Sequence, residues 1–391
     1  MSEPYDIAIV GAGIHGVGVA QAAAAAGYSV LLLERREPAA GTSSRSSKLI
    51  HGGLRYLEQL QLGLVRECLR ERELLLKLAP DLVKIKPFYI PIYAGTRRRP
   101  WQLYAGLSLY AVLAGPGHHA AFRTLKKDEW DSLGGLTTDG LQQVFQYWDG
   151  QTDDAALTRA VLHSARSLGA ETRIPVDFLG ADLEARGVTL RLREDGKEQR
   201  CRARVLVNAA GPWVAQVDAL ITPFTSNVQS DLVQGTHILV DIPAQGGIFY
   251  MEVPADGRAV FLMPWKGMSL VGTTEIPFAG REPAATTPSD QERDYLRKVV
   301  QHYFPGREFK ELGAFSGLRV LPRNAARPFD RGRELILGVD RGYRPRVISL
   351  YGGKLTSYRA DSLKVLRKVR GALPSRTARG DTAKLPLQPV D

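Results

Sequence analysis

The amino-acid sequence predicts an α/β protein in which a doubly wound parallel sheet is interrupted by a second, largely antiparallel α+β domain. Two observations lead to this prediction. A strand, a glycine-rich turn, a small-residue helix and a second strand open the chain, and buried apolar runs return late, after long stretches of alternating pattern. The 391 residues suffice for two domains, and 44% hydrophobic with 24% charged residues is typical of a globular protein.

The opening segment reads as one complete βαβ unit. Tyr5–Val10 is a short apolar strand, Ile14–Ala26 is a helix of small residues, and Gly27 ends it. Val30–Leu33 is then a second buried strand. Parallel strands joined by a crossover helix are typical of a doubly wound sheet.

The remaining elements show two kinds of sequence pattern. An amphipathic helix is predicted at Leu62–Leu78, where Pro80 stops it. Buried strands that end in glycine turns recur at Arg204–Asn208 and Val347–Leu350, as in the opening unit. Antiparallel β character is expected at Lys86–Tyr93, Val144–Trp148, Thr236–Val240, Arg258–Met263 and Ser269–Gly272.

These two patterns divide the chain into segments that belong alternately to the first domain and to an inserted second domain. We expect a discontinuous nucleotide-binding domain from residues 1–80, 150–215 and 315–375. Residues 81–149 and 216–314 form the inserted substrate domain, and residues 376–391 are expected to be a linker-like tail with little structure of its own.

The glycine-rich turn fits the pattern GxGxxG. Gly11 allows the tight turn, Gly13 lets the backbone approach a pyrophosphate, and Gly16 permits close helix–strand contact. The helix begins at Ile14 and directs its N–H groups and macrodipole at the phosphates. Glu34, at the end of the next strand, can accept hydrogen bonds from a ribose diol. This context predicts a Rossmann-like dinucleotide site, although a plain βαβ unit is the alternative.

A loop rich in hydroxyl groups distinguishes FAD from NAD. Residues 41–48 contain Thr42, Ser43, Ser44, Ser47 and Lys48. Such a loop can wrap a second set of phosphate and ribitol oxygens, which a nicotinamide enzyme does not need. The alternative is a mobile polar loop.

Five sequence blocks stand out, at residues 42–57, 208–213, 272–275, 316–319 and 352–359. Together they resemble the FAD-dependent glycerol-3-phosphate dehydrogenases, within the D-amino-acid-oxidase-like flavoprotein superfamily. The resemblance runs from Tyr5 to about Arg370. Glu275 stands where members commonly have Asp, and the chain ends near Leu385–Leu387, where many members continue into a helical C-terminal domain.

The resemblance implies FAD as the cofactor and a Rossmann-like FAD-binding domain. The residues expected to bind FAD are Gly11, Gly13, Ile14, His15, Gly16, Glu34, Arg35, Thr42, Ser43, Ser44, Ser47, Lys48, Leu49, Ala209, Gly211, Trp213, Gly272, Thr273, Gly353, Lys354, Leu355 and Thr356. No attachment pattern for a covalent flavin and no metal site are expected.

The resemblance also implies hydride transfer to flavin N5 from sn-glycerol 3-phosphate, giving dihydroxyacetone phosphate. A phosphorylated substrate brings nearly two negative charges, which several cations hold best. Arg319 and Lys354 are therefore expected in the catalytic pocket, with His51 and His237 as candidate proton acceptors, because imidazole has a suitable pKa. Arg55, Tyr56 and Arg331 are expected to bind the substrate. Each cation taken singly could instead be a surface residue.

Composition limits the partners. A net charge of +11 favours anionic partners, although a solvated basic surface explains it as well. The basic residues are dispersed, so no nucleic-acid partner is expected. The resemblance implies a membrane quinone as electron acceptor, with oxygen as the other route. Arg97–Arg99 and the apolar stretch Leu103–Leu113 suit an interfacial membrane contact, or equally an ordinary core helix.

The sequence has only two cysteines, and it has no apolar run long enough to cross a bilayer. Both observations favour a cytoplasmic protein, and attachment to the inner face of the cell membrane is the alternative. The N-terminus lacks the pattern of a cleaved signal. Two rival functions remain. One is an amino-acid or 2-hydroxy-acid oxidase of the same superfamily, and the other is a non-catalytic dinucleotide-binding sensor.

Overall fold

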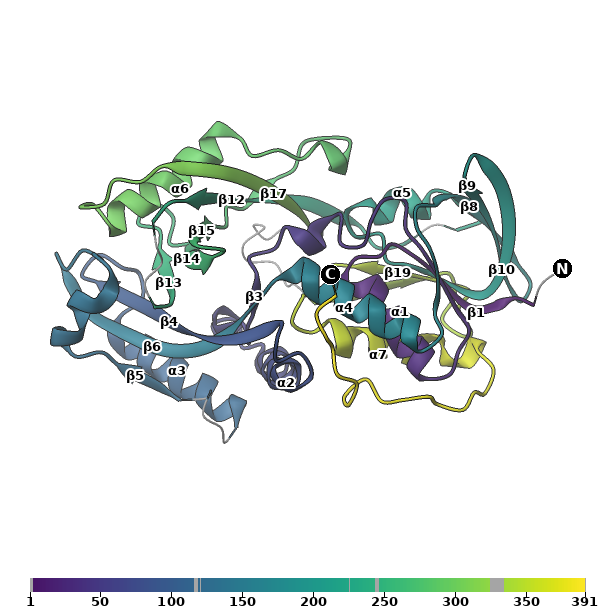
Figure 1. Cartoon of the computed structure of the whole chain (residues 1–391), viewed down its shortest axis with the longest axis horizontal. Helices are drawn as coiled ribbons and strands as arrows, with labels where there is room; N and C mark the ends of the chain where they lie inside the picture. The colour runs from purple at the N-terminus through teal and green to yellow at the C-terminus, as the bar shows by residue number, and fades with distance from the viewer. Residues whose placement is uncertain are drawn as a thin grey trace.

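The computed structural model describes residues 3–115, 119, 121–224, 226–242, 246–323 and 334–390, and of Arg55 it describes only the backbone. Two sheets organise these residues, one in each lobe of the elongated molecule (Figure 1). The helices are α1 (Ile14–Ala25), α2 (Leu62–Leu78), α3 (Pro100–Ala114), α4 (Asp154–Ser167), α5 (Val214–Asp218), α6 (Asp290–Tyr303) and α7 (Tyr358–Val369).

The first sheet contains the doubly wound core that the sequence predicts. Its path is β11-β8-β9-β10-β1-β2-β7, and β19 pairs with β10 and β18. The pairings of β1 with β2 and β10, and of β10 with β19, are parallel. Its strands are β1 (Tyr5–Val10), β2 (Val30–Leu33), β7 (Glu171–Arg173), β8 (Asp177–Glu184), β9 (Gly187–Glu194), β10 (Lys197–Asn208), β11 (Ile221–Thr222), β18 (Ile336–Val339) and β19 (Val347–Tyr351).

Helices α1, α4 and α7 pack together in this lobe (Figure 1). Helix α1 is buried almost all round because its small residues let neighbours approach closely. A Cβ at Gly18 would lie 2.7 Å from the Tyr358 ring on α7. The small-residue composition of α1 therefore fixes the packing behind the first glycine turn.

The second sheet is largely antiparallel, as expected for the inserted domain. Its path is β16-β12-β15-β14-β13-β4-β6-β3, with β17 beside β12 and β5 beside β6. Its strands are β3 (Leu49–Ile50), β4 (Val83–Tyr93), β5 (Phe122–Thr124), β6 (Leu141–Thr152), β12 (Ser230–Val240), β13 (Ile248–Glu252), β14 (Ala259–Trp265), β15 (Met268–Gly272), β16 (Ile276–Pro277) and β17 (Glu311–Pro322).

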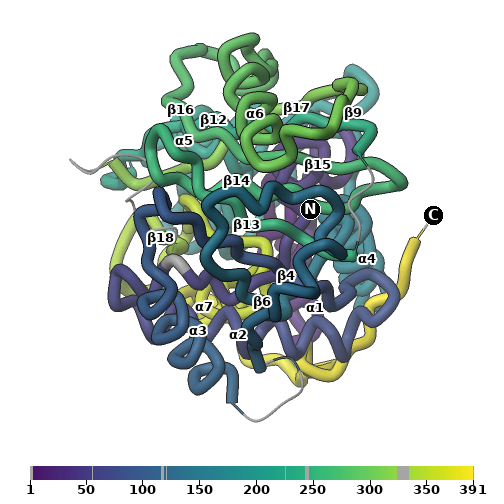
Figure 2. Tube along the Cα trace, turned by 90° about the vertical axis from the view of Figure 1, so that its left-hand side faces the viewer, coloured from purple at the N-terminus to yellow at the C-terminus, as the bar shows by residue number. Residues whose placement is uncertain are grey.

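The second sheet has α6 at one end and α3 at the other. Helix α6 packs on β12, β14 and β15, whereas α3 contacts β5, β6 and α2. Looking along the molecule, α6 lies at the top of the view and α2 and α3 lie at the bottom (Figure 2). The α+β architecture predicted for this domain is confirmed.

Strand β17 differs from the expected division of the chain. We expected the nucleotide domain to resume at residue 315, yet β17 pairs with β12 along nearly its whole length, from Ser230↔Pro322 to Val240↔Glu311. The alternating sequence of Ser316–Arg319 did not reveal this partner, because strand pairing over such a separation leaves no local pattern. Arg319 therefore projects from the substrate sheet.

The C-terminal tail is more than a linker. Residues 373–390 form no helix or strand, but Arg376 makes an ion pair with Asp6 at 3.0 Å. Leu387 is 3% exposed, and its N–H donates to the carbonyl of Leu78. These contacts bind a tail without helix or strand to the first lobe.

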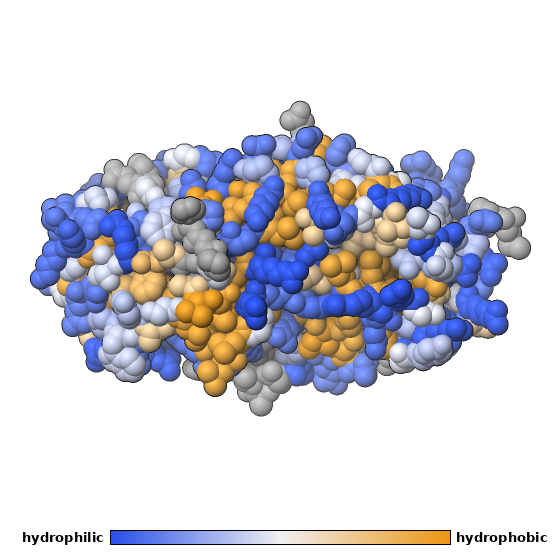
Figure 3. Space-filling view, turned by 90° about the horizontal axis from the view of Figure 1, so that it is seen from below, coloured by the Kyte–Doolittle hydropathy of each residue, from blue (hydrophilic) through white to orange (hydrophobic). Residues whose placement is uncertain are grey.

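None of the helices within the described residues is long and apolar enough to cross a membrane. One surface nevertheless exposes large apolar side chains. On α3, Trp101, Tyr104 and Val112 are 71%, 57% and 75% exposed. Seen from below, an apolar patch interrupts the charged surface in the half of the molecule that carries α3 (Figure 3).

Candidate active site

A cleft of about 440 Å³ lies where the carboxyl ends of β1, β2, β10 and β19 meet β17 of the other sheet. Open α/β sheets bind ligands at this edge. The cleft brings together most of the predicted residues: Gly11, Gly13, Ile14, His15, Glu34, Arg35, Thr42, Ser43, Ser47, Leu49, His51, Tyr56, Ala209, Gly211, Trp213, Arg319, Gly353, Lys354, Leu355 and Thr356.

The glycine turn has the geometry that its sequence requires. Gly11 has φ +104°, and a Cβ there would lie 2.7 Å from the carbonyl oxygen of Ala209. Gly16 does not line the cleft. A Cβ at Gly16 would lie 1.8 Å from the carbonyl oxygen of Gly11, so this third glycine lets α1 pack on the turn. The backbone N–H groups at the start of α1 are thereby presented to the cleft.

Glu34, which follows β2, holds the glycine turn through its carboxylate. Its Oε2 accepts a hydrogen bond from Ala12 N at 2.9 Å, and Oε1 accepts one from Arg36 N at 3.0 Å. Each carboxylate oxygen retains a second lone pair, which can accept from a ribose hydroxyl. Next to it, the guanidinium of Arg35 lies 5.3 Å from the centroid of the Trp213 ring.

The hydroxyl-rich loop connects the glycine turn to the second sheet. Ser43 Oγ accepts from Ile14 N at 2.9 Å, and Thr42 Oγ1 donates to the carbonyl of Leu318 on β17 at 2.6 Å. The loop therefore lies between the two sheets as part of the cleft wall.

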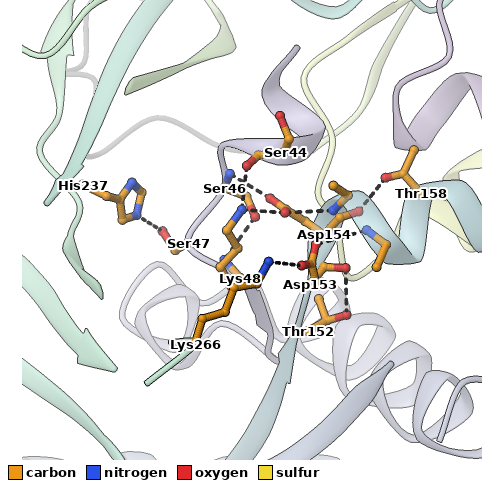
Figure 4. Close-up of polar contacts among 12 residues, drawn as sticks. Ser44, Ser46, Ser47, Lys48, Thr152, Asp153, Asp154, Thr158, His237 and Lys266 are labelled. Carbon is orange, nitrogen blue, oxygen red and sulfur yellow. Dashed lines mark hydrogen bonds and ion pairs between the residues drawn. The ribbon is translucent and has the colours of Figure 1, made fainter. Parts of the chain in front are cut away.

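Two members of this loop are turned away from the cleft. Lys48 is 4% exposed, and its Nζ donates to the Ser44 carbonyl and to Asp154 Oδ1, both at 2.6 Å (Figure 4). Neither Ser44 nor Lys48 is among the cleft-lining residues that the structure describes. We expected both to contact FAD, but burial forces the ammonium to pair with a carboxylate instead.

Asp154 is a residue that sequence reasoning missed. It is fully buried at the start of α4, lines the cleft, and its Oδ2 accepts from Ser46 N at 2.9 Å. Together with the Lys48 ion pair, this bond holds both sides of the loop. The only sequence signal was an acidic pair, Asp153-Asp154, at a helix N-terminus, and such a pair does not reveal a distant partner.

His237 lies behind the cleft rather than in it. Its Nε2 is 3.0 Å from Ser47 Oγ, its ring stacks on Phe315, and it is 1% exposed (Figure 4). Burial, reinforced by the charges of Arg319 and Lys48, lowers its pKa to about 3. We expected a possible direct proton acceptor, and the structure corrects this. His237 is neutral near neutral pH and, among the residues that the structure describes, it reaches the cleft through Ser47.

Gly272 and Thr273 also lie outside the cleft lining in the described part of the chain. A Cβ at Gly272 would lie 2.2 Å from Cδ2 of His237, and one at Gly235 would lie 2.6 Å from Thr273 Oγ1. These two residues therefore pack against His237 and β12, and their expected contact with the cofactor stays a prediction.

Arg319 and Lys354 also line the cleft, and we call the part that they line the cationic pocket. Arg319 Nη1 is 3.3 Å from Glu275 Oε1, and a Cβ at Gly235 would lie 3.2 Å from Arg319 Nη2. The absence of a side chain at Gly235 thus leaves room for the guanidinium. Of the other predicted cations, Arg331 lies outside the described residues, and the side chain of Arg55 is not described.

Lys354 enters the pocket from the turn after β19. Gly352 and Gly353 have φ of +80° and +87°, which favours glycine at both positions. The Lys354 ammonium lies 3.8 Å from the Tyr56 ring centroid and 3.8 Å from Cys68 Sγ. Burial raises the pKa of Cys68 to about 11, although Lys354 opposes the shift, so the thiol stays protonated.

These features fit FAD. The turn at Gly11 has no room for a side chain, so backbone can approach a diphosphate, and Glu34 can accept from a ribose. The same cleft is lined by Ser43, Ser47 and the two cations of the cationic pocket, so hydroxyl groups and positive charge share it with the glycine turn.

Comparison with known proteins agrees with this geometry. Residues 6–359 match the DAO family model, described as FAD dependent oxidoreductase. D-erythritol 1-phosphate dehydrogenase of Brucella abortus is 36% identical over 384 residues, covering 96% of this chain and 76% of that protein. Glycerol-3-phosphate dehydrogenase of Pseudomonas aeruginosa is 38% identical over 372 residues, covering 92% and 70%.

Solved structures share the fold. Glycerol-3-phosphate dehydrogenase from Bacillus halodurans, complexed with FAD, gives a TM-score of 0.76 at 24% identity and covers 99% of this chain and 68% of that chain. L-alpha-glycerophosphate oxidase from Mycoplasma pneumoniae, with FAD bound, gives 0.77 at 17% identity, with 100% of both chains covered. The predicted resemblance is confirmed, and the chain belongs to the DAO family of FAD-dependent oxidoreductases.

Proposed function

We propose that this flavoprotein oxidises the secondary alcohol of sn-glycerol 3-phosphate to dihydroxyacetone phosphate. The observation that carries the proposal is the convergence of Arg319, Lys354 and His51 on one cleft that the dinucleotide turn also lines. The glycerol-3-phosphate dehydrogenases among the relatives support the same substrate.

The cations hold the phosphate in this proposal. A phosphate monoester carries nearly two negative charges at neutral pH, and the guanidinium of Arg319 offers two parallel donors. Lys354 contributes a compact charge from a different element, held over the face of Tyr56. Arg55 and Arg331 are proposed as further phosphate ligands from the sequence alone.

The reaction removes a hydride from the carbinol carbon and a proton from its hydroxyl, leaving a carbonyl. Bound FAD supplies the acceptor for the hydride. His51 is the proposed proton acceptor, because it lines the cleft, whereas His237 is screened by Ser47. Ser47, oriented by His237, is proposed to contact the flavin end of the cofactor, and the other cleft-lining residues predicted above are its proposed ligands.

The decisive experiment is an anaerobic titration of the purified yellow protein. We expect sn-glycerol 3-phosphate to bleach the visible flavin absorbance, and D-erythritol 1-phosphate, named for the Brucella relative, is the first alternative polyol phosphate. An amino acid and 2-hydroxyglutarate serve as controls. Bleaching by either control but by no phosphorylated polyol would overturn the proposal. Bleaching by none of them, with salt-sensitive polynucleotide binding, would favour a sensor.

The electron acceptor is proposed to be a membrane quinone. The exposed Trp101, Tyr104 and Val112 on α3 resemble an interfacial surface, and Arg97 and Arg99, which precede this helix in the chain, are also exposed. Arg98 is turned inward, where it makes an ion pair with Glu252 at 2.7 Å. Only two of the three arginines can therefore face acidic headgroups.

Vesicle sedimentation tests this contact. We expect binding to vesicles that contain anionic lipid, and a several-fold loss in a Trp101→Ala, Val112→Ser variant. Tyr343→Ala is the matched control, because Tyr343 is 74% exposed in a different lobe. Equal binding by all three proteins would remove α3 from the proposal and leave oxygen as the acceptor to be tested.

A further inference from the structure

Helix α3 is linked to the substrate end of the cleft by a buried hydroxyl group. Leu103, Leu107 and Tyr110 form its inner face, and Tyr110 is 3% exposed. The backbone N–H of Gly52 donates to Tyr110 Oη at 2.8 Å, and this oxygen donates its proton to Asp149 Oδ2 at 2.7 Å. Gly52 directly follows His51 in the chain.

Asp149 is itself fixed. It lies on β6, is 1% exposed, and its Oδ1 accepts from Arg72 Nη1 on α2 at 2.6 Å. Burial raises the pKa of Asp149, and the Arg72 guanidinium opposes that shift most strongly among its neighbours. A buried carboxylate held by a guanidinium and a phenol is a rigid hydrogen-bond acceptor. The Tyr110 hydroxyl proton therefore points at Asp149, and the Tyr110 oxygen remains free to accept from Gly52 N.

The preceding amide is anchored from the opposite side. His51 N donates to Thr356 Oγ1 at 3.1 Å, in the turn that carries Lys354. Two consecutive amides are thus held by different parts of the molecule: the turn after β19 holds the first, and Tyr110 on α3, together with the Asp149 carboxylate, holds the second. The space around Gly52 is full, since a Cβ there would lie 2.4 Å from Tyr110 Oη and 2.7 Å from Leu69.

We propose that Tyr110, oriented by Asp149, is a positioning residue that sets the place of His51 in the cleft. This inference rests on the proposed role of His51 as the proton acceptor. Tyr110 lines no part of the cleft that the structure describes, so it acts through the backbone of Gly52. A displacement of His51 by a fraction of its hydrogen-bonding reach is enough to slow proton transfer.

Tyr110→Phe removes the hydroxyl group and keeps the ring. We expect the rate of flavin reduction at saturating sn-glycerol 3-phosphate to fall about 10- to 100-fold, with flavin content unchanged. The matched control is Tyr303→Phe. Tyr303 on α6 is also buried, and its hydroxyl donates to the Glu252 carbonyl in an apolar cluster that does not include Tyr110. The control should reduce flavin within about twofold of the unaltered protein.

A double-mutant cycle separates positioning from a general loss of structure. If Tyr110 acts through His51, then in a His51→Asn background the Tyr110→Phe change should alter the rate by less than about twofold. The same loss in both backgrounds would overturn the proposal, and so would a Tyr110→Phe rate within twofold of the unaltered protein.

Amide hydrogen exchange gives a readout that does not depend on activity. We expect the peptide that covers residues 49–57 to exchange faster in Tyr110→Phe and in Asp149→Asn, but not in Tyr303→Phe. If neither variant folds, exchange in the unaltered protein decides, and a Gly52 amide as labile as an exposed loop would overturn the anchor. Absence of flavin reduction in the unaltered protein would instead contradict the proposed function, while the exchange result would stand.

Discussion

The two ends of the cleft are built in different ways. At the dinucleotide end, backbone atoms form most of the site, since Gly11 leaves no space for a Cβ and Glu34 accepts a hydrogen bond from the backbone of Ala12. At the substrate end, side chains do the work. Arg319 and Lys354 arrive from different sheets, and each is held by a partner, Glu275 or Tyr56, from another element.

This difference suggests that cofactor retention and turnover can be damaged separately. Adding atoms at the dinucleotide end should remove the flavin, whereas deleting atoms at the substrate end should slow the reaction and leave the protein yellow. Three of the four predictions below test that separation, and one tests whether His237 is buried away from the cleft.

The largest effect is expected at Gly16. In Gly16→Ala the new Cβ would meet the Gly11 carbonyl oxygen at 1.8 Å, so the helix must move away from the turn. We expect purified protein with little or no bound FAD, measured as flavin per chain. Gly63→Ala is the matched control, because a Cβ on Gly63 in α2 has no atom within 4 Å. A fully loaded Gly16→Ala protein would contradict the backbone account of this end.

The next effect is expected at Arg319. Arg319→Ala should lower the rate of flavin reduction by about 100-fold or more, because a charge-assisted phosphate contact is lost, and should keep full flavin content. Arg323→Ala is the control, since Arg323 follows β17, is largely exposed, and pairs with Asp231 at 2.8 Å. Stopped-flow reduction by sn-glycerol 3-phosphate makes the measurement. A colourless Arg319→Ala protein would mean that the two ends are not separable.

The same division explains what the sequence could predict. Gly11, Gly13 and Glu34 lie within one βαβ unit, where local spacing dictates geometry, so the doubly wound sheet and the position of its turn could be predicted. The family resemblance supplied His51, Arg319 and Lys354, which the structure brings to one cleft.

Other features depend on pairing between distant segments. The ion pair of Lys48 with Asp154 spans more than a hundred residues, as does the bond between Ser47 and His237. No local pattern encodes either contact, so the loop composition and the family resemblance, which placed Lys48 and His237 in the cleft, did not reveal their partners. Strand β17 was misplaced for the same reason.

A third prediction concerns the pH dependence of stability. The pKa of His237 is about 3 in the folded protein and 6.5 in the unfolded chain. The unfolded chain therefore binds more protons than the folded protein between these two pH values. The contribution of His237 is therefore complete above pH 6.5 and is lost as pH falls toward 3, by up to about 1.4 kcal/mol per pH unit.

Urea unfolding at several pH values measures this contribution. We expect the free energy of unfolding of His237→Gln to fall less steeply with acidification than that of the unaltered protein. His163→Gln, at an exposed site on α4, should follow the unaltered protein. Parallel curves for all three proteins would show that the imidazole is accessible to protons, and hence that Ser47 does not screen it.

The smallest effect is expected at Glu282, whose Oε1 accepts a hydrogen bond from Trp213 Nε1 at 2.9 Å beside the stacked Arg35. Glu282→Gln keeps an acceptor but removes the charge, and the contact is exposed. We therefore expect FAD affinity to weaken by no more than about threefold, with an unchanged reduction rate. Fluorescence titration of the apoprotein with FAD measures the affinity. A tenfold loss would show that side chains contribute as much as backbone at the dinucleotide end, and the contrast between the two ends would then be one of degree only.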